Sequence, residues 1–175
     1  RVGGAAWPAS RIVGAFRECG RVDLELRDLP GAGHARLLTL APSRRFDDFL
    51  RRVAAGTAYC GVAITEPGAG SDLHNLATAA TPVSGGYRLD GTKQHVARIE
   101  ECTHLIVFAA IRRAPDNPLI TAFLVPKDAP GVTVERLAPM GMTNVSWGRV
   151  HFAGVPLDGS QRIGGERQAL TLVVR

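Results

Sequence analysis

The sequence predicts an α+β fold in which N-terminal helices precede an antiparallel β-barrel. Apolar residues recur at helical spacing up to about residue 57, and they alternate with polar residues from Ala58 onward. Turns rich in Gly, Pro and Asp separate the later apolar runs. A helical pattern returns after residue 165. We therefore expect a partial helical domain at 1–57, a β-barrel at 58–162, and the start of a second helical domain at 163–175.

The helical part is predicted in three pieces. Residues 11–19 form a short amphipathic stretch, and 24–40 is interrupted by a Pro-Gly pair. Residues 46–54 carry apolar side chains at i, i+3, i+4, i+7 and i+8. Ser43 is the expected N-cap of this last helix, and Gly56 is its expected C′ residue.

The β part is predicted from alternation and from turn chemistry. We expect turns at 90–91, 115–118 and 129–131, where Asp, Asn, Pro and Gly gather. A short helical turn is possible at 72–76, and 81–86 is expected to break the pattern before the strands resume. The expected strands are 59–65, 87–90, 92–97, 104–111, 120–125, 132–137 and 148–152.

Composition argues against several function classes. The 175 residues hold no apolar run near the roughly 20 residues that cross a bilayer, and no signal peptide, so we expect a cytoplasmic protein without a membrane partner. The net charge of +5 comes with few aromatic residues and no basic stripe, which disfavours nucleic acid. Cys19, Cys60 and Cys102 are odd in number and far apart, and no histidine has ligand spacing, so neither disulfides nor a metal site is expected.

The most informative motif is TEPGAGSD at 65–72, directly after the apolar Val62–Ile64. A glycine-rich turn with a hydroxyl at each end can bring backbone N–H groups close to an anionic cofactor. A dinucleotide fingerprint is disfavoured, because Leu73 stands where the third glycine belongs. The alternative is a strand-exit turn capped by Ser71 or Asp72, which would need most of the same residues.

Five ordered motifs resemble the acyl-CoA dehydrogenase family. The resemblance runs from about residue 13 to the end and is most specific from 58 to 165. The motifs are AITEPGAGSD at 63–72, GGYRLDGTK at 85–93, AFLV and PGV at 122–125 and 130–132, MG at 140–141, and VHF with VP at 150–152 and 155–156.

This resemblance implies a three-part enzyme, in which a middle β-barrel and a C-terminal four-helix bundle hold FAD together. The chain is then a fragment whose C-terminal bundle is missing, and the general base is expected in that missing region. The implied reaction is α,β-dehydrogenation of an acyl thioester carried on coenzyme A or on a carrier protein. A homo-oligomer is implied for the whole enzyme, and the electron acceptor is unknown.

The resemblance also assigns roles to individual residues. Ile64 and Thr65 would offer backbone N–H groups, and Thr65 its hydroxyl, to the pyrimidine edge of the flavin. Gly68 and Gly70 would let the loop approach the cofactor. Gly70 and Ser71 would meet the pyrophosphate or the acyl-thioester substrate.

The strand expected along the flavin departs from the family pattern. Where the family usually has an aromatic, an aliphatic and a threonine residue, this chain has His95, Val96 and Ala97. Ala97 has no hydroxyl to donate. The acids of 98–101 replace an Asn-Gly turn and are expected near the cofactor edge, and Thr143 occupies the place of a common arginine.

Several alternatives follow from these departures. His95 is a ring stacked beside flavin, an altered acid–base group, or a surface residue on an edge that has lost its cofactor. The whole protein is a dehydrogenase, a flavin-dependent monooxygenase relative, or a degenerate, non-catalytic homologue that binds an acyl chain or a partner. Glu66 and Asp72 are expected to be structural rather than an acid–base pair.

Overall fold

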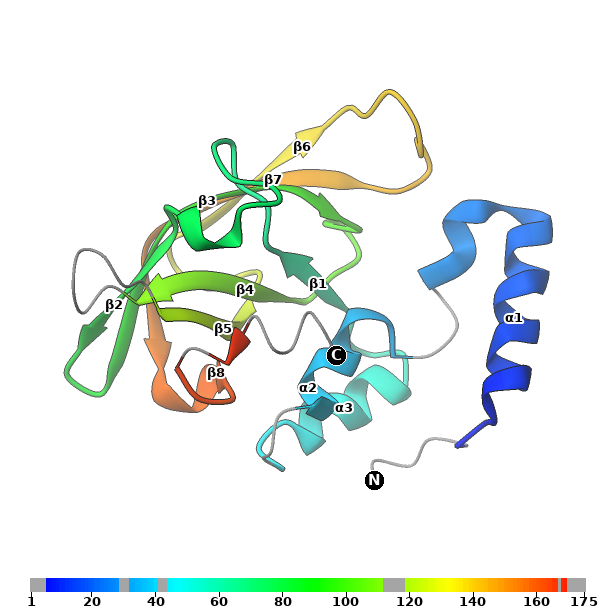
Figure 1. Ribbon diagram of the computed structural model, residues 1–175, viewed down its shortest axis with the longest axis horizontal. Helices are drawn as coiled ribbons and strands as arrows, with labels where there is room; N and C mark the ends of the chain where they lie inside the picture. Colours follow the sequence, from blue (N-terminus) through cyan, green and yellow to red (C-terminus); the bar gives the residue numbers. More distant parts are fainter. Residues whose placement is uncertain (1–5, 29–31, 41–43, 112–118, 167, 170–175) are drawn as a thin grey trace.

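The computed structural model describes residues 6–28, 32–40, 44–111, 119–166 and 168–169. N-terminal helices lie beside one 8-stranded sheet (Figure 1), which confirms the α+β class. Within these described ranges, no helix is both long enough and apolar enough to cross a membrane.

The helices confirm the three predicted pieces, with differences in detail. The middle piece is built largely of 3₁₀ turns, and its Pro-Gly pair lies outside the described residues. Ser43 also lies outside them, and the N-cap position of the last helix is Phe46, which makes no side-chain capping hydrogen bond. The elements are α1 (Ala9–Val22), η1 (Leu24–Asp28), η2 (Gly33–Ala35), α2 (Arg36–Leu40) and α3 (Asp47–Ala54).

The C-terminus of α3 has the expected glycine. Gly56 has a φ of +72° and donates its N–H to the Val53 carbonyl (3.0 Å). Thr57 donates to the Arg52 carbonyl (2.9 Å), which completes a Schellman motif. The prediction that Gly56 is the C′ residue is therefore confirmed.

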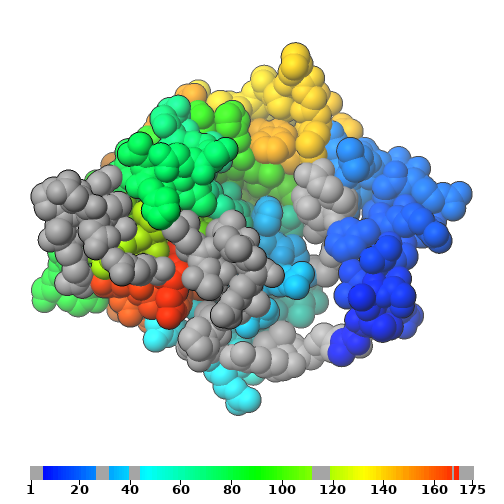
Figure 2. All heavy atoms as spheres, viewed as in Figure 1, coloured from blue at the N-terminus to red at the C-terminus, as the bar shows by residue number. Residues whose placement is uncertain are grey.

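Helix α1 stands apart from the rest. It lies to the side of the sheet in Figure 1 and forms one flank of the surface in Figure 2. None of its residues is buried, and Val13 is 64% exposed. By contrast, α3 buries Phe49 and Leu50 against the sheet.

The sheet has the strand order β6-β7-β3-β2-β4-β5-β8, and β1 pairs with β4 off this path. Most pairs are antiparallel as predicted, whereas β4 pairs in parallel with both β1 and β2. The strands are β1 (Cys60–Ala63), β2 (Ala79–Val83), β3 (Gly86–Ala97), β4 (His104–Ile111), β5 (Leu119–Pro126), β6 (Val132–Leu137), β7 (Trp147–Asp158) and β8 (Arg162–Ile163).

Two predictions in the β part were wrong. The segment 81–86 does not simply break the pattern, because 79–83 forms β2 and a hairpin to β3 closes at Gly85, whose φ is +83°. The expected turn at 90–91 is a β-bulge, since β3 continues through it beside β7. Gly91 has a φ of +144°, and Asp90 accepts the N–H of Gly154 on β7 (2.7 Å). The predicted turn at 115–118 lies outside the described residues.

Strand β4 is buried on both faces. Ile106 and Phe108 face the cluster that contains the α3 side chains, while Leu105 and Val107 face the interior core formed with β3 and β7. This explains why the strand reads as a continuous apolar run rather than as an alternation. Strand β1, next to β4, is thereby fixed where the TEPGAGSD motif begins.

Candidate functional site

The segment after β1 makes a tight turn at Pro67-Gly68. Glu66 donates its N–H to the Ala69 carbonyl (2.9 Å), and Ala69 donates back (3.2 Å). Asp72 then accepts the N–H two residues further on (3.2 Å) and caps the 3₁₀ turn η3 (Leu73–Asn75). A strand-exit turn with a capping Asp is therefore part of the fold, and so is the short helical turn expected at 72–76.

A buried ion pair lies beneath this turn. Lys93 Nζ is 2.7 Å from Glu66 Oε1, and the two side chains are 0% and 3% exposed. Lys93 Nζ also donates to the Ile64 carbonyl (2.7 Å). The Glu66 carboxylate accepts the N–H groups of Ala77 (2.6 Å) and Thr78 (3.0 Å). Both charges therefore have the hydrogen bonds that burial demands.

Burial and pairing shift the pKa of both groups. Burial lowers the pKa of Lys93 to about 8, against the opposing hydrogen bond and charge of Glu66. Burial alone would raise the pKa of Glu66, but hydrogen bonds from Lys93 and Thr78 outweigh it and hold that pKa below its usual value. Because Glu66 is engaged in this pair and Asp72 is a cap, the two do not form a paired-carboxylate acid–base site.

A cavity of about 210 Å³ lies beside the end of β1. It brings together four of the eight residues expected to contact the cofactor, from two segments about 30 positions apart. Val96, which lies between two of these residues, is fully buried in the interior core, so its side chain supports the sheet instead. The lining residues are His34, Val62, Ile64, Thr65, Gln94, His95 and Ala97.

Two backbone donors at this cavity have no partner among the residues that the structure describes. The Ile64 carbonyl accepts from Lys93, and the Thr65 carbonyl accepts from the Gln94 N–H (2.8 Å). Among the described hydrogen bonds, the N–H groups of Ile64 and Thr65 donate to no protein acceptor. Buried or half-buried donors without partners mark a place where a ligand can supply acceptors.

The remaining predicted contacts lie on the exposed turn beyond this cavity. A Cβ added to Gly68 or Gly70 would meet no atom within 4 Å, and neither glycine has a positive φ. Ser71 is exposed beside them. The fold therefore does not require glycine at 68 or 70, and the open space suits a ligand that approaches the backbone closely.

The chemistry of FAD matches the cavity and the turn in two respects. The pyrimidine edge of a flavin presents carbonyl oxygens and ring nitrogens, which match the free N–H groups of Ile64 and Thr65. The bare backbone at Gly68 and Gly70 leaves room for a bulky anionic group. The residues present therefore fit half of a flavin site.

His95 occupies a strained position at the rim. Its φ is +56°, which is uncommon for a residue other than glycine, and it lies in the register shift between Lys93 and Val96. The side chain is exposed and borders a second cavity of about 500 Å³, which also includes Trp147 and Arg149. The bulge therefore places the His95 imidazole at the surface, between these two cavities.

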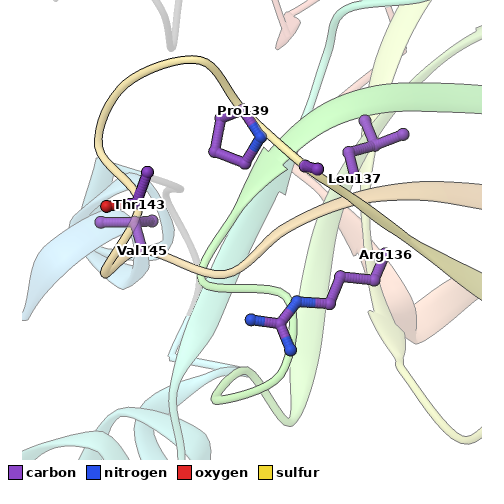
Figure 3. Close-up of a pocket in the computed structure, with 6 residues that line it drawn as sticks. Arg136, Leu137, Pro139, Thr143 and Val145 are labelled. Atoms are coloured by element: carbon purple, nitrogen blue, oxygen red, sulfur yellow. The ribbon is translucent and has the colours of Figure 1, made fainter.

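A third cavity, of about 360 Å³, lies under the loop that joins β6 to β7 (Figure 3). Thr143, which takes the place of a common arginine in the family, is in its wall. The cation in this wall is Arg136, which is paired with Glu100 (3.1 Å). The lining residues are Arg136, Leu137, Ala138, Pro139, Thr143 and Val145.

The acids expected near the cofactor edge are engaged elsewhere. Glu100 pairs with Arg136, and Glu101 accepts the Ser146 hydroxyl and lies 3.7 Å from Arg98. These contacts tie the turn after β3 to the β6–β7 region. Neither acid lines the cavity that contains Thr65.

Sequence reasoning gave no role to Lys93, Gln94 or His34. A signal for Lys93 was present, since it falls on the inward side of the alternation that starts with Tyr87 and Leu89. A single lysine in an inward apolar series needs a buried anion, and Glu66 is the acid nearest the glycine-rich turn. No comparable pattern marks His34, whose place depends on how the helices pack.

Comparison with known proteins agrees with this geometry. Residues 61–155 match the family described as acyl-CoA dehydrogenase, middle domain. The chain is 35% identical to benzylmalonyl-CoA dehydrogenase of Aromatoleum aromaticum over 94% of its length, and 33% identical to L-prolyl-[peptidyl-carrier protein] dehydrogenase of a Serratia species over 69%. It spans 44% and 31% of these relatives, less than half of either.

Solved structures show the same fold. An acyl-CoA dehydrogenase from Geobacillus kaustophilus superposes with a TM-score of 0.91 at 21% identity, over 99% of this chain and 47% of that one. The FAD complex of PigA superposes with a TM-score of 0.75 at 27% identity, over 93% of this chain and 41% of that one. The chain, with its glycine-rich turn and free backbone donors, therefore belongs to the acyl-CoA dehydrogenase family.

Proposed function

We propose that this chain forms part of an FAD-dependent oxidoreductase that dehydrogenates an acyl thioester between its α and β carbons. The observation that carries the proposal is the pair of free N–H groups of Ile64 and Thr65 at a cavity that His95 and Ala97 also line. When bound, FAD would accept the β-hydride, which carries the two electrons that this oxidation releases, while the general base takes the α-proton. The general base is expected outside this chain.

Individual residues would hold the cofactor as follows. Ile64 and Thr65 would donate to the pyrimidine edge, where electron density gathers on reduction. Gly68 and Gly70 would allow close approach, and Ser71 would contact the pyrophosphate or the acyl thioester. On the facing strand, His95 and Ala97 would border the ring system, while Val96 would contribute through its backbone.

The relatives support the substrate class. One relative is named for a coenzyme A thioester and another for an aminoacyl group on a peptidyl-carrier protein. We therefore propose an acyl thioester on coenzyme A or on a carrier protein as the substrate. We further propose the domain division 1–57, 58–162 and 163–175, and a homo-oligomer for the whole enzyme.

The test uses the full-length protein. Its visible absorption spectrum is recorded before and after addition of FAD, and then anaerobically with a panel of acyl-CoA and acyl-carrier-protein thioesters. A bound-flavin band that a thioester bleaches without oxygen supports dehydrogenation. A Thr65→Val variant, which removes the hydroxyl and keeps the side-chain volume, should bind FAD more weakly.

Other outcomes separate the alternatives. Absence of flavin uptake by the folded protein would refute the proposal and favour a non-catalytic homologue that binds an acyl chain or a partner. Flavin that thioesters leave oxidised, but that consumes oxygen once it has been chemically reduced in the presence of substrate, would favour the monooxygenase relative.

A further inference from the structure

The candidate site is built from two strands that are not ladder partners. Strand β1 pairs with β4, whereas β3 pairs with β2 and β7. The cavity nevertheless takes Ile64 and Thr65 from the segment just after β1 and His95 and Ala97 from the end of β3. The distance between its two walls therefore depends on contacts other than the sheet ladder.

Four hydrogen bonds cross between these segments. Two come from Gln94, whose N–H donates to the Thr65 carbonyl (2.8 Å) and whose side chain donates to the Glu66 carbonyl (3.3 Å). The other two come from Lys93 Nζ, which binds the Ile64 carbonyl and the Glu66 carboxylate, each at 2.7 Å. Of the two donor residues, only Lys93 has a fully buried side chain, since Gln94 is half-buried.

The Lys93 contact fixes the direction of a peptide group. In a planar trans peptide, the carbonyl of one residue and the N–H of the next point to opposite sides. Lys93 holds the Ile64 carbonyl toward the buried side. The N–H of Thr65, which belongs to the same peptide plane, is thereby directed away from Lys93.

We propose that Glu66 and Lys93 are positioning residues of the cofactor site, which aim the Thr65 N–H and set the spacing between the Ile64–Thr65 wall and the His95–Ala97 wall. The identity of the ligand as FAD rests on the proposed function, whereas the aiming of the peptide does not. Glu66 holds the ion pair in place, because its carboxylate also accepts hydrogen bonds from the N–H groups of Ala77 and Thr78.

A positioning role differs from a stabilising one. Replacing a buried ion pair with neutral side chains of similar volume is often close to neutral for stability. The double variant Glu66→Gln/Lys93→Met keeps the volume and leaves an amide oxygen to accept a backbone N–H. It removes the donor to the Ile64 carbonyl, so it should affect ligand binding far more than folding.

The experiment compares full-length variants by FAD titration and by thermal unfolding of the apoprotein. The double variant should bind FAD about tenfold more weakly, the cost of one misaimed hydrogen bond, with an unfolding temperature near that of the wild type. Glu66→Gln/Lys93→Gln retains a side-chain donor at 93 and should recover part of the affinity. Asp48→Asn/Arg51→Met removes an exposed ion pair on α3 and should change neither quantity.

A second measurement does not need the cofactor. Hydrogen exchange of the Gln94 N–H, which reports its bond to Thr65, should be about tenfold faster in the double-variant apoprotein. If the wild type takes up no FAD, the proposed function fails, and the exchange rate alone decides the positioning role. Unchanged Gln94 exchange overturns that role, as does unchanged FAD affinity where the wild type binds.

If the Met-containing variant does not fold, the Glu66→Gln/Lys93→Gln variant is measured against the wild type, and equal exchange and equal affinity overturn the proposal.

Discussion

Gln94 donates its backbone N–H to the carbonyl of Thr65 across 2.8 Å, and so joins the end of β3 to the segment that follows β1. The two residues are almost 30 positions apart in the sequence. Their contact makes the glycine-rich turn and the bulged strand parts of one site. Changes in either segment are therefore expected to act on the same ligand.

Gly70→Val should separate cofactor binding from folding. An added Cβ meets no protein atom within 4 Å and the backbone has no positive φ, so the unfolding temperature should stay near that of the wild type. The branched side chain would occupy the space that a ligand needs, and FAD affinity should fall by about tenfold or more. Equilibrium FAD titration and thermal unfolding of the full-length protein measure the two effects.

Gly56→Ala is the matched control, with the opposite result. Gly56 closes the Schellman motif with a φ of +72°, a conformation that alanine adopts at a cost of about 1 kcal/mol. The variant should unfold at a lower temperature and bind FAD normally. A normal affinity in Gly70→Val would contradict the role given to the turn.

The sequence was enough to predict the helices and most strands, because the spacing of apolar residues along the chain follows directly from which face of each helix or strand is buried. Strand β4 matched its predicted bounds, 104–111, since a run buried on both faces is apolar throughout. Strand β2 was missed because Thr81 and Pro82 read as a loop, although Pro82 pairs with Tyr87 in the first hairpin.

The site was predictable only in part. The resemblance placed Ile64, Thr65, His95 and Ala97 together, and the structure puts them around one cavity. The left-handed backbone of His95 could not be foreseen, because it arises from the bulge in β3, which depends on the pairing with β7. Long-range register of this kind leaves no local pattern in the chain.

His95→Gly should increase the stability of the folded state and weaken FAD binding. Glycine adopts a φ of +56° without the steric cost that histidine bears, which favours the folded state by up to about 1 kcal/mol. Losing the exposed ring at the cavity rim should at the same time weaken FAD binding. The measurements are denaturant unfolding of the apoprotein and FAD titration.

Met142→Gly provides the comparison for that variant. Met142 has a similar φ of +54° but lines none of the cavities that His95 borders. It should gain stability in the same way while FAD affinity stays unchanged. If both variants lose FAD equally, the effect of His95→Gly would reflect backbone flexibility and not the ring.

Ala97→Thr tests the missing hydroxyl. Ala97 is half-buried at the cavity, so a threonine there can present an O–H donor toward a bound flavin. A donor beside the ring stabilises the reduced form, and flavin reduction by a good thioester substrate should be faster by several-fold up to about tenfold. Ala97→Val adds the same volume without the hydroxyl and should not accelerate reduction. Equal rates in the two variants would argue against a hydrogen bond at this position.

Stability should increase with pH where Lys93 titrates. Burial lowers the pKa of Lys93 to about 8 in the folded chain, whereas the ordinary value is 10.5. Between these values the unfolded state binds more protons than the folded state, so the free energy of unfolding rises with pH. The cost of burying the ammonium group is fully present below pH 8 and is relieved as the pH approaches 10.5. The neutral amine still has two hydrogens for the Ile64 carbonyl and the Glu66 carboxylate, so its contacts persist.

Glu66 has the opposite dependence at low pH. Its pKa is lowered in the folded chain, so it contributes stability above its ordinary value of 4.5, and this contribution is lost as the pH falls through the lowered pKa. Glu66→Gln/Lys93→Met lacks both groups. The difference in unfolding free energy between the wild type and this variant should therefore rise with pH in two windows, below about pH 4.5 and from about pH 8 to 10.5. Denaturant unfolding across this pH range measures the difference. A difference that stays constant between pH 8 and 10.5 would show that the pKa of Lys93 is not lowered in the folded chain.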